Sequence, residues 1–285
     1  MKKTQWITTG VAVCIVLFLF KYGKIIPPQK ADTPNLTSIL AVETIAIDSL
    51  LIEAKKFITK EQVLRLNILE NSISRGDVKQ QRLKVYHQLA HFWGDSAKIF
   101  EPYAWYEAEA ARLESSEKNL TFAAHLFLEN LQVDEVPERR RWKALQAKDL
   151  FERSLQINPD NDSAKVGLGA CYIYGNISSS PMEGIGKIRE VVEKDSTNIY
   201  ALLTLAKGSV ISGQYDKAAS RLETVHRLKP NNLEAIMLLA DLYEGLKNNP
   251  KAISWYQKSL LLIMRQDIRD EIEKRIKTLA LGEKE

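Results

Sequence analysis

Apolar residues recur at intervals of three and four positions through nearly every segment of this chain from Leu36 onward. In the first such stretch the stripe runs through Ile39, Val42, Ile45-Ala46, Ser49-Leu50 and Glu53-Ala54. This spacing is the period of one face of an α-helix, and no segment shows the alternation of a half-buried strand. The pattern therefore predicts an all-α protein.

Local start and stop signals place individual helices within this pattern. Thr59-Lys60-Glu61-Gln62 has the form of a capping box, which opens a helix running to about Ser74. Arg75-Gly76 closes that helix, because glycine adopts the left-handed conformation of a helix end without strain. Residues 36–76 are therefore expected to form an N-terminal helical pair.

The C-terminal half repeats one helix–turn–helix register. When Ala147, Ala218 and Ala252 are aligned, the residues four positions later are Phe151, Leu222 and Tyr256. The residues seven positions later are Ser154, Val225 and Ser259. Pro159 and Pro230 lie twelve positions after the first two alanines. The helix after each turn carries a leucine beside a small residue, in Leu168-Gly169, Leu205-Ala206 and Leu239-Ala240.

This register resembles the tetratricopeptide repeat, a helix–turn–helix unit of about 34 residues. The resemblance covers residues 161–266 and is looser over residues 77–160, where a longer loop is expected around residues 133–138. It implies a right-handed α-solenoid in which small residues let paired helices approach and large ones fill the space between pairs. The chain departs from the pattern at the insertion in residues 177–182, at Ser196 and at Ser209. Residues 267–285 form the expected capping helix, with one apolar face made of Ile268, Ile272, Ile276 and Leu279.

The amino terminus is interpreted as a transmembrane anchor. Residues 1–24 contain an uncharged run from Thr4 to Phe20, with Trp6 and Tyr22 at its ends, so that residues 4–22 suit a membrane span. A cleaved signal peptide remains an alternative, although no small-x-small cleavage site follows Phe20. A lipoprotein signal at Cys14 fits poorly, because the apolar run continues past the cysteine. Residues 25–35 read as a proline-containing linker.

Charge separates the anchor from the rest of the chain. The net charge is +4, yet residues 1–30 carry five lysines and no acid, which leaves 35 basic and 36 acidic side chains for the remainder. A nucleic-acid-binding body would carry a basic surface, so no nucleic-acid partner is expected. Lysines on both sides of the anchor nearly cancel as orientation signals; the short amino-terminal tail favours a body on the periplasmic side of the inner membrane.

Candidate chemical motifs are few. His87 and His91 share a helix face, but Gln88 stands where a zinc protease has its catalytic glutamate and no third ligand is evident. Gly184-Ile185-Gly186-Lys187 lacks the context of a phosphate loop, and Gly184 fits a small packing position. The acidic run Glu107, Glu109, Glu114 and Glu117 reads as a solvated helix face, and Cys171 as a packed thiol. No catalytic, cofactor or metal site is predicted.

The tetratricopeptide resemblance implies a binding groove lined by the first helix of each unit. Carried over to this sequence, the groove residues are Tyr174, Tyr200, Leu203, Lys207, Ile211, Met237, Asp241 and Glu244. Val166 and Ala170 occupy the positions where some members clamp a terminal carboxylate, so that ligand is not expected. The alternative is that Tyr174 and Tyr200 simply pack against the neighbouring insertion.

The resulting hypothesis is a non-enzymatic, membrane-tethered scaffold of the bacterial cell envelope. It holds a partner peptide or helix in the groove, and no small-molecule substrate is expected. Two alternatives stay open: an accessory subunit of a catalytic system of cytochrome maturation or peptidoglycan type, and a self-assembling structural array. An enzyme using His87 and His91 is the weakest alternative.

Overall fold

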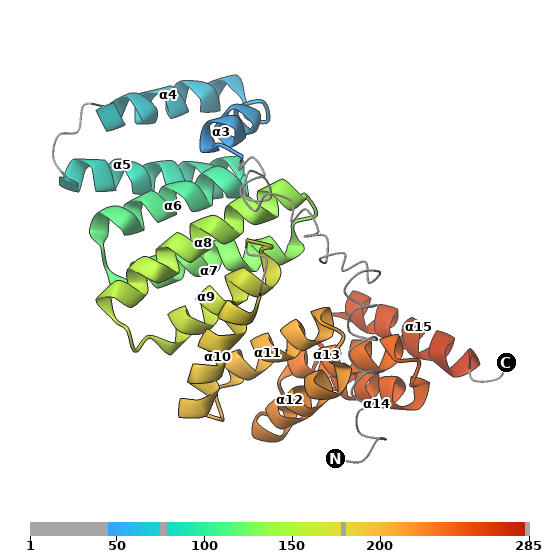
Figure 1. Cartoon of the computed structure of the whole chain (residues 1–285). Helices are drawn as coiled ribbons and strands as arrows, with labels where there is room; N and C mark the ends of the chain where they lie inside the picture. The colour runs from blue at the N-terminus through green and yellow to red at the C-terminus, as the bar shows by residue number, and fades with distance from the viewer. Residues whose placement is uncertain (1–44, 75–78, 178–180, 283–285) are drawn as a thin grey trace, which may run out of the picture. The chain divides into compact units, whose positions relative to one another are not determined.

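The computed structural model describes residues 45–74, 79–177 and 181–282. All regular secondary structure in these ranges is helical (Figure 1). The predicted anchor, the linker and the Arg75-Gly76 stop signal lie outside them. The first helices are α3 (Ile47–Lys55), α4 (Lys60–Ser74), α5 (Lys79–His91), the π-helical turn η1 (Phe92–Ala97), α6 (Phe100–Glu114), α7 (Glu117–Val133) and α8 (Pro137–Ile157). They are followed by α9 (Asp162–Tyr174), α10 (Met182–Lys194), α11 (Ile199–Ile211), α12 (Tyr215–Leu228), α13 (Leu233–Gly245), α14 (Asn249–Leu260) and α15 (Gln266–Leu281).

The capping box predicted at the start of α4 is confirmed. The backbone N–H of Thr59 donates to Gln62 Oε1 at 2.9 Å, and the backbone N–H of Gln62 donates back to Thr59 Oγ1 at 3.2 Å. The Gln62 amide also donates to the Ser96 carbonyl in η1 at 3.0 Å. One side chain therefore both starts α4 and ties it to the next helical pair.

From α5 to α14 the helices form successive pairs, and each second helix also packs against the first helix of the next pair (Figure 1). The α-solenoid predicted from the sequence is confirmed. The aligned positions of α8, α12 and α14 are all fully buried: Ala147, Ala218, Ala252, Phe151, Leu222, Tyr256, Ser154, Val225 and Ser259. The repeated spacing therefore identified the faces on which these helices pack.

Asparagine side chains start the first helix of the last three pairs. The side-chain oxygen accepts a hydrogen bond from the backbone N–H three positions on at 2.9, 3.0 and 2.8 Å, for Asn161, Asn198 and Asn232 respectively. Each cap satisfies a backbone donor that a helix start leaves free. The turns after residues 159, 196 and 230 thus stop one helix and start the next within a few residues.

The closest approach of α9 and α10 depends on two glycines. A Cβ atom built at Gly169 would lie 2.6 Å from the Gly184 carbonyl oxygen, and one at Gly184 would lie 2.5 Å from the Gly169 oxygen. Neither distance is compatible with a larger residue. Gly184 therefore fills the packing position expected of it and lies inside a helix, not in a phosphate-binding loop.

The longer loop expected around residues 133–138 is not present. Only Asp134–Val136 separate α7 from α8, and the additional residues extend these helices to 17 and 21 residues. The short connection encloses a buried charge, because Lys143, 1% exposed, is in ion-pair contact with Asp134 and lies 2.8 Å from Glu101. Arg139 completes the cluster at 2.6 Å from Asp134, and the hydrogen bonds from these cations hold the Asp134 pKa well below its ordinary range despite burial.

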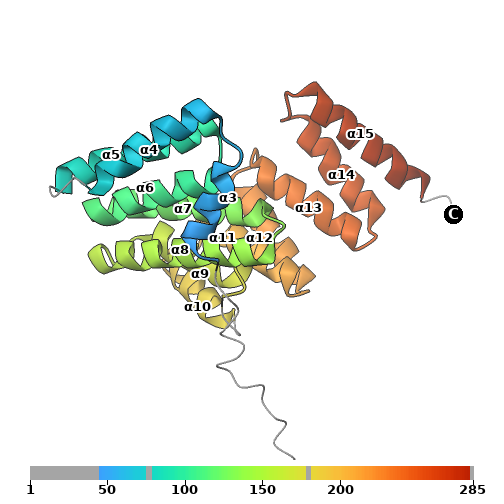
Figure 2. The same cartoon turned by 90° about the horizontal axis from the view of Figure 1, so that it is seen from above.

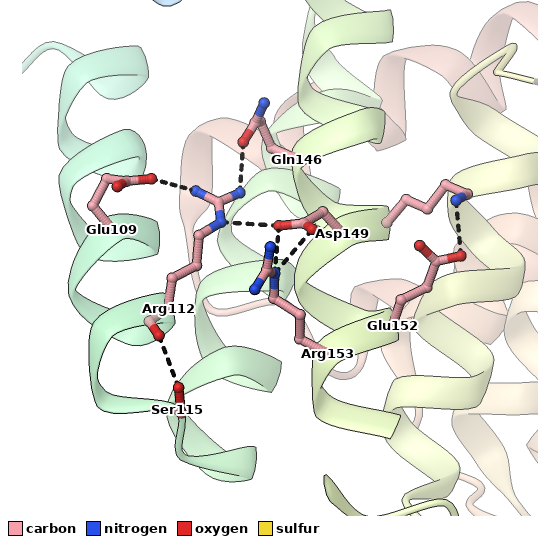
Figure 3. A network of polar contacts seen from close by, with 8 residues as sticks. Glu109, Arg112, Ser115, Gln146, Asp149, Glu152 and Arg153 are labelled. Atoms are coloured by element: carbon pink, nitrogen blue, oxygen red, sulfur yellow. Dashed lines mark hydrogen bonds and ion pairs between the residues drawn. The ribbon is translucent and has the colours of Figure 1, made fainter. Parts of the chain in front are cut away.

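A second polar network joins α6 to α8 (Figure 3). Arg112 donates to Glu109 on its own helix at 2.7 Å, and to Asp149 at 2.9 Å and Gln146 at 2.7 Å on α8. Asp149 also accepts from Arg153 at 2.9 Å. All three nitrogen atoms of the guanidinium group are thus engaged, and they link α6 to α8, the second helices of two successive pairs.

The capping helix is confirmed as α15, which packs beside α14 (Figure 2). Ile272 is 5% exposed, and Ile268, Ile276 and Leu279 pack against the same apolar cluster. Among the described residues, no helix is long and apolar enough to cross a membrane. The predicted span at residues 4–22 lies outside the described residues.

Candidate partner-binding groove

The predicted groove residues on α9 and at the start of α11 are packing residues. The Tyr174 hydroxyl donates to the Thr204 carbonyl at 3.3 Å, and the Tyr200 ring lies 5.7 Å from the ring of His125 on α7. Leu203 is 7% exposed and belongs to the core cluster of α11 to α15. Burial raises the pKa of both tyrosines. This section of the predicted groove is therefore filled by the protein's own side chains.

These tyrosines pack, as the alternative to an open groove expected. Described partners lie on α11 for Tyr174 and on α7 for Tyr200, and Tyr174 packs against the same core cluster as Ile177 of the insertion. Residues 178–180 of the insertion lie outside the described residues. The clamp positions are also closed, since Val166 is fully buried and Ala170 is 1% exposed. The assignment of Leu203 to an open groove is wrong, because its side chain is buried in the core cluster of α11 to α15.

Three further groove residues lie around the junction of α11 and α13. Lys207 forms an ion pair with Glu234 at 2.6 Å and reaches Gln132 on α7 at 3.4 Å. Met237 packs partly against the core, whereas Ile211 is 65% exposed. The lysine is therefore already engaged within the chain, and Ile211 is the open apolar side chain at this junction.

The two predicted groove carboxylates, Asp241 and Glu244, hold the capping helix. The buried Tyr256 hydroxyl donates to Asp241 at 2.6 Å and to Glu244 at 2.7 Å, while Arg275 of α15 lies 2.7 Å from Glu244. Burial opposes the charge on Glu244, but the hydrogen bonds from Arg275 and Tyr256 outweigh it and hold its pKa below the ordinary value. These carboxylates are thus matched to cations and donors of the same chain.

An open groove lies further upstream, where none of the eight residues was placed. A pocket of about 460 Å³ lies between α5, η1 and α6, and one of about 180 Å³ lies between α5, α6 and α7. The two pockets share Glu107, and we call them together the α5–α7 groove. The first is lined by His91, Gly94, Asp95, Lys98, Ile99, Phe100, Tyr103 and Glu107; the second by His87, Glu107, Ala111, Glu114, Asn119, Phe122 and Ala123.

Two glutamates of α6 face a histidine of α5 in this groove. His87 Nδ1 lies 4.0 Å from Glu107 and Nε2 lies 3.8 Å from Glu114, with the side chains of Glu107 and Glu114 21% and 25% exposed. Asn119 of α7 donates to Glu114. Burial raises the pKa of Glu107 above its ordinary value, although His87 and His91 oppose the shift. The groove therefore has an acidic floor that is partly shielded from water.

The interpretation of the acidic run as a solvated face is consequently wrong. Glu107 and Glu114 line the groove, Glu109 joins the Arg112 network, and Glu117 accepts a hydrogen bond from Asn161. The seven-residue spacing of Glu107 and Glu114 placed both on one helix face, a signal that sequence reasoning did not use. His87 faces those glutamates, whereas His91 contacts Asp95 at 3.0 Å on an exposed surface. In the described part of the chain, no group of three or more His, Cys, Asp or Glu side chains is arranged to hold a metal ion.

Comparisons with known proteins agree with this fold. A family model described as tetratricopeptide repeat matches residues 210–262. The solved structure of a tetratricopeptide repeat protein from Parabacteroides merdae superposes with a TM-score of 0.54 at 16% identity, covering 82% of this chain and 86% of the other. Residues 210–262 thus match the tetratricopeptide-repeat family, and the described helices share the tetratricopeptide fold.

The chain is also similar in sequence to a named bacterial protein over part of its length. Over 93 residues, or 33% of this chain, it is 28% identical to a Haemophilus influenzae protein named as the cytochrome c-type biogenesis protein CcmH. The match spans only 20% of the length of that relative. The structure of a MamA fragment from Desulfovibrio magneticus covers 65% of this chain and 97% of its own at 18% identity, with a TM-score of 0.43. A tetratricopeptide fold indicates a scaffold for protein–protein interaction.

Proposed function

We propose that this protein is a membrane-tethered scaffold that binds a segment of a partner protein in the α5–α7 groove. The observation that carries the proposal is the contrast between two regions: the section over α9 is filled by Tyr174 and Tyr200, whereas the α5–α7 groove is open. The groove also presents an apolar contact, because Phe122 on its wall is 56% exposed. A concave surface with apolar walls and a few polar groups suits a peptide or a helix.

The charge of the groove defines the chemistry of the partner. Asp95, Glu107 and Glu114 face it against the single cation Lys98 among its lining residues. A partly shielded pair of carboxylates attracts a cation more strongly than an exposed pair, because less water screens the interaction. The partner segment therefore carries a lysine or arginine beside an apolar residue, which packs on Phe122.

The location in the cell belongs to the same proposal. Residues 4–22 hold the protein in the inner membrane of a bacterial envelope, with the body on the periplasmic side. Tethering raises the local concentration of the repeats near membrane-bound partners without any new contact. The role is binding and not catalysis.

A second candidate is an accessory role in cytochrome maturation, favoured by the likeness to the Haemophilus influenzae protein. In that case the partner recovered is a component of the maturation system. The same groove and the same partner chemistry serve both candidates, so the identity of the captured protein separates them.

Photo-crosslinking in cells tests the proposal. A photoreactive amino acid replaces Phe122 in the full-length chain, and crosslinked proteins are identified after detergent extraction. We expect one reproducible partner whose capture falls at least about tenfold in a Glu107→Gln/Glu114→Gln variant. The matched control is Glu190→Gln/Glu193→Gln, which removes two exposed glutamates of α10 and leaves capture unchanged.

Two outcomes contradict the proposal. If both glutamine variants capture the partner equally well, the acidic floor of the groove takes no part in recognition. Crosslinks only between copies of this chain indicate a self-assembling array. Protease treatment of spheroplasts tests the location separately: digestion of the body from outside is expected, and full protection of the body overturns the periplasmic assignment.

A further inference from the structure

A pocket of about 160 Å³ lies on a different part of the molecule, where α10, the end of α11 and the start of α12 meet. Its apolar walls include Ile173, Ile185 and Leu205. Its polar lining consists of Arg189, Ser209, Ser212, Gln214, Lys217 and Arg221, and no lining residue is acidic. This pocket shares no residue with the α5–α7 groove.

The three cations of this pocket have no counter-charge. Arg189 of α10, Lys217 and Arg221 of α12 form no ion pair with any residue that the structure describes, unlike Arg112, Lys143 and Arg275 elsewhere. Lys217 donates to Gln214 at 2.7 Å and Arg221 donates to Ser209, both neutral partners. Three positive charges therefore line one hollow without an ion-pair partner among the described residues.

The two arginines repel each other in the folded protein. Burial lowers the pKa of Arg221 below its ordinary value, and the nearby charge of Arg189 lowers it further. The arrangement thus costs folding free energy that a structural ion pair would not. An anion between the two guanidinium groups converts this repulsion into attraction.

The neighbouring backbone also favours a negative ligand. Gln214 is the N-cap residue of α12 and makes no side-chain cap, so that the positive end of this helix borders the pocket beside Lys217. The last carbonyls of α11 are occupied by turn hydrogen bonds, with Gly208 accepting from Ser212 at 3.1 Å and Ser209 accepting from Gln214 at 2.8 Å. These two carbonyl groups are thus already hydrogen-bonded within the chain.

We propose that this pocket binds a doubly charged oxyanion of the phosphate class. Two arginines and a lysine match a dianion better than a single carboxylate, because a monoanion leaves more of the positive charge uncompensated. The planar arginine groups suit the oxygen geometry of phosphate, and the apolar wall accommodates a small apolar group attached to it. The site is independent of the α5–α7 groove and of the protein bound there.

Titration with inorganic phosphate and with phenyl phosphate, followed by calorimetry and by the thermal midpoint of unfolding, tests this site. We expect saturable binding that weakens at least about tenfold in Arg189→Gln. The matched control is Arg227→Gln, on the exposed surface of α12 outside the pocket, which retains the affinity of the unmodified protein. Tighter binding of phenyl phosphate than of inorganic phosphate indicates a phosphate carried by an apolar molecule; equal affinities indicate free phosphate.

A second readout separates a ligand site from a structural role. Without phosphate, Arg189→Gln is expected to melt at the same or a higher temperature than the unmodified protein, because only repulsion is lost. With saturating phosphate the order reverses. Equal affinity of Arg189→Gln and Arg227→Gln for phosphate, binding of acetate as tight as that of phosphate, or no binding at all overturns the proposal.

Discussion

The ring of His125 on α7 lies 5.7 Å from the ring of Tyr200 on α11, across the first helix of the intervening repeat, α9. Gln132 and Lys207 join the same two helices at 3.4 Å. First helices of alternate repeats thus touch each other over α9 and close the surface that a tetratricopeptide array ordinarily offers to a ligand. Further upstream, Glu107 and Glu114 line the open α5–α7 groove instead.

Tyr200 is expected to act as a packing residue. Its hydroxyl is buried without a hydrogen-bond partner among the described residues, so Tyr200→Phe should leave the free energy of unfolding unchanged or raise it by up to about 1 kcal/mol. Tyr200→Ala should cost about 2–4 kcal/mol, because it leaves a cavity beside His125. Urea unfolding measures both. If Tyr200→Ala keeps its stability but no longer captures the partner, Tyr200 belongs to the binding surface and is not a packing residue.

His125 should make stability depend on pH. Burial lowers its pKa below the ordinary value, although Glu129 opposes the shift, so the folded protein takes up this proton less readily than the unfolded chain. The stability associated with the neutral imidazole of His125 is fully present above about pH 6.5, and it is lost as the pH falls below that value. Unfolding midpoints in urea at pH 7.5 and pH 5 should therefore differ more for the unmodified protein than for His125→Gln.

The raised pKa of Glu107 acts in the opposite direction, because its protonation on acidification favours the folded state. The comparison with His125→Gln isolates the histidine, since both proteins keep the glutamate. An identical pH dependence for the two proteins would mean that His125 does not contribute to the pH dependence of stability.

Two glycines of neighbouring helices should respond oppositely to alanine. Gly169→Ala places a Cβ atom 2.6 Å from the Gly184 carbonyl oxygen and should cost about 1–3 kcal/mol by forcing α9 and α10 apart. Gly186→Ala, with nothing within 4 Å of the new Cβ, should stabilise α10 by about 0.5–1 kcal/mol. Thermal unfolding of both variants checks this. Equal effects at the two positions would mean that the helices do not meet at Gly169.

The buried lysine of α8 should be far more costly to remove than a lysine five residues further along the same helix. Lys143→Met leaves Asp134 and Glu101 buried with less positive charge and should cost about 3–5 kcal/mol. Lys148→Met removes a lysine whose partner, Glu152, lies at 2.8 Å on the same helix near solvent, and should cost less than about 1 kcal/mol. Similar losses in denaturant unfolding would contradict the buried cluster.

The helices themselves could be predicted because their signals are local. The Thr59–Gln62 capping box, the aligned alanines of α8, α12 and α14, and the apolar face of α15 depend on spacings of three, four and seven residues. Such spacings fix which side chains share a helix face whatever the helix packs against. For the same reason Gly184 and Cys171, which is fully buried, could be assigned to packing from the sequence alone.

The binding surface could not be predicted in the same way. A helix face shows which side chains are neighbours, but not whether a helix from another repeat covers them. Tyr200 meets His125, Asp241 and Glu244 meet Tyr256 and Arg275, and Glu107 is left facing His87 in a hollow, all through contacts between distant segments. Only the tertiary structure decided these, because each contact joins segments that lie far apart in the sequence, and local spacing does not specify which of them pack together.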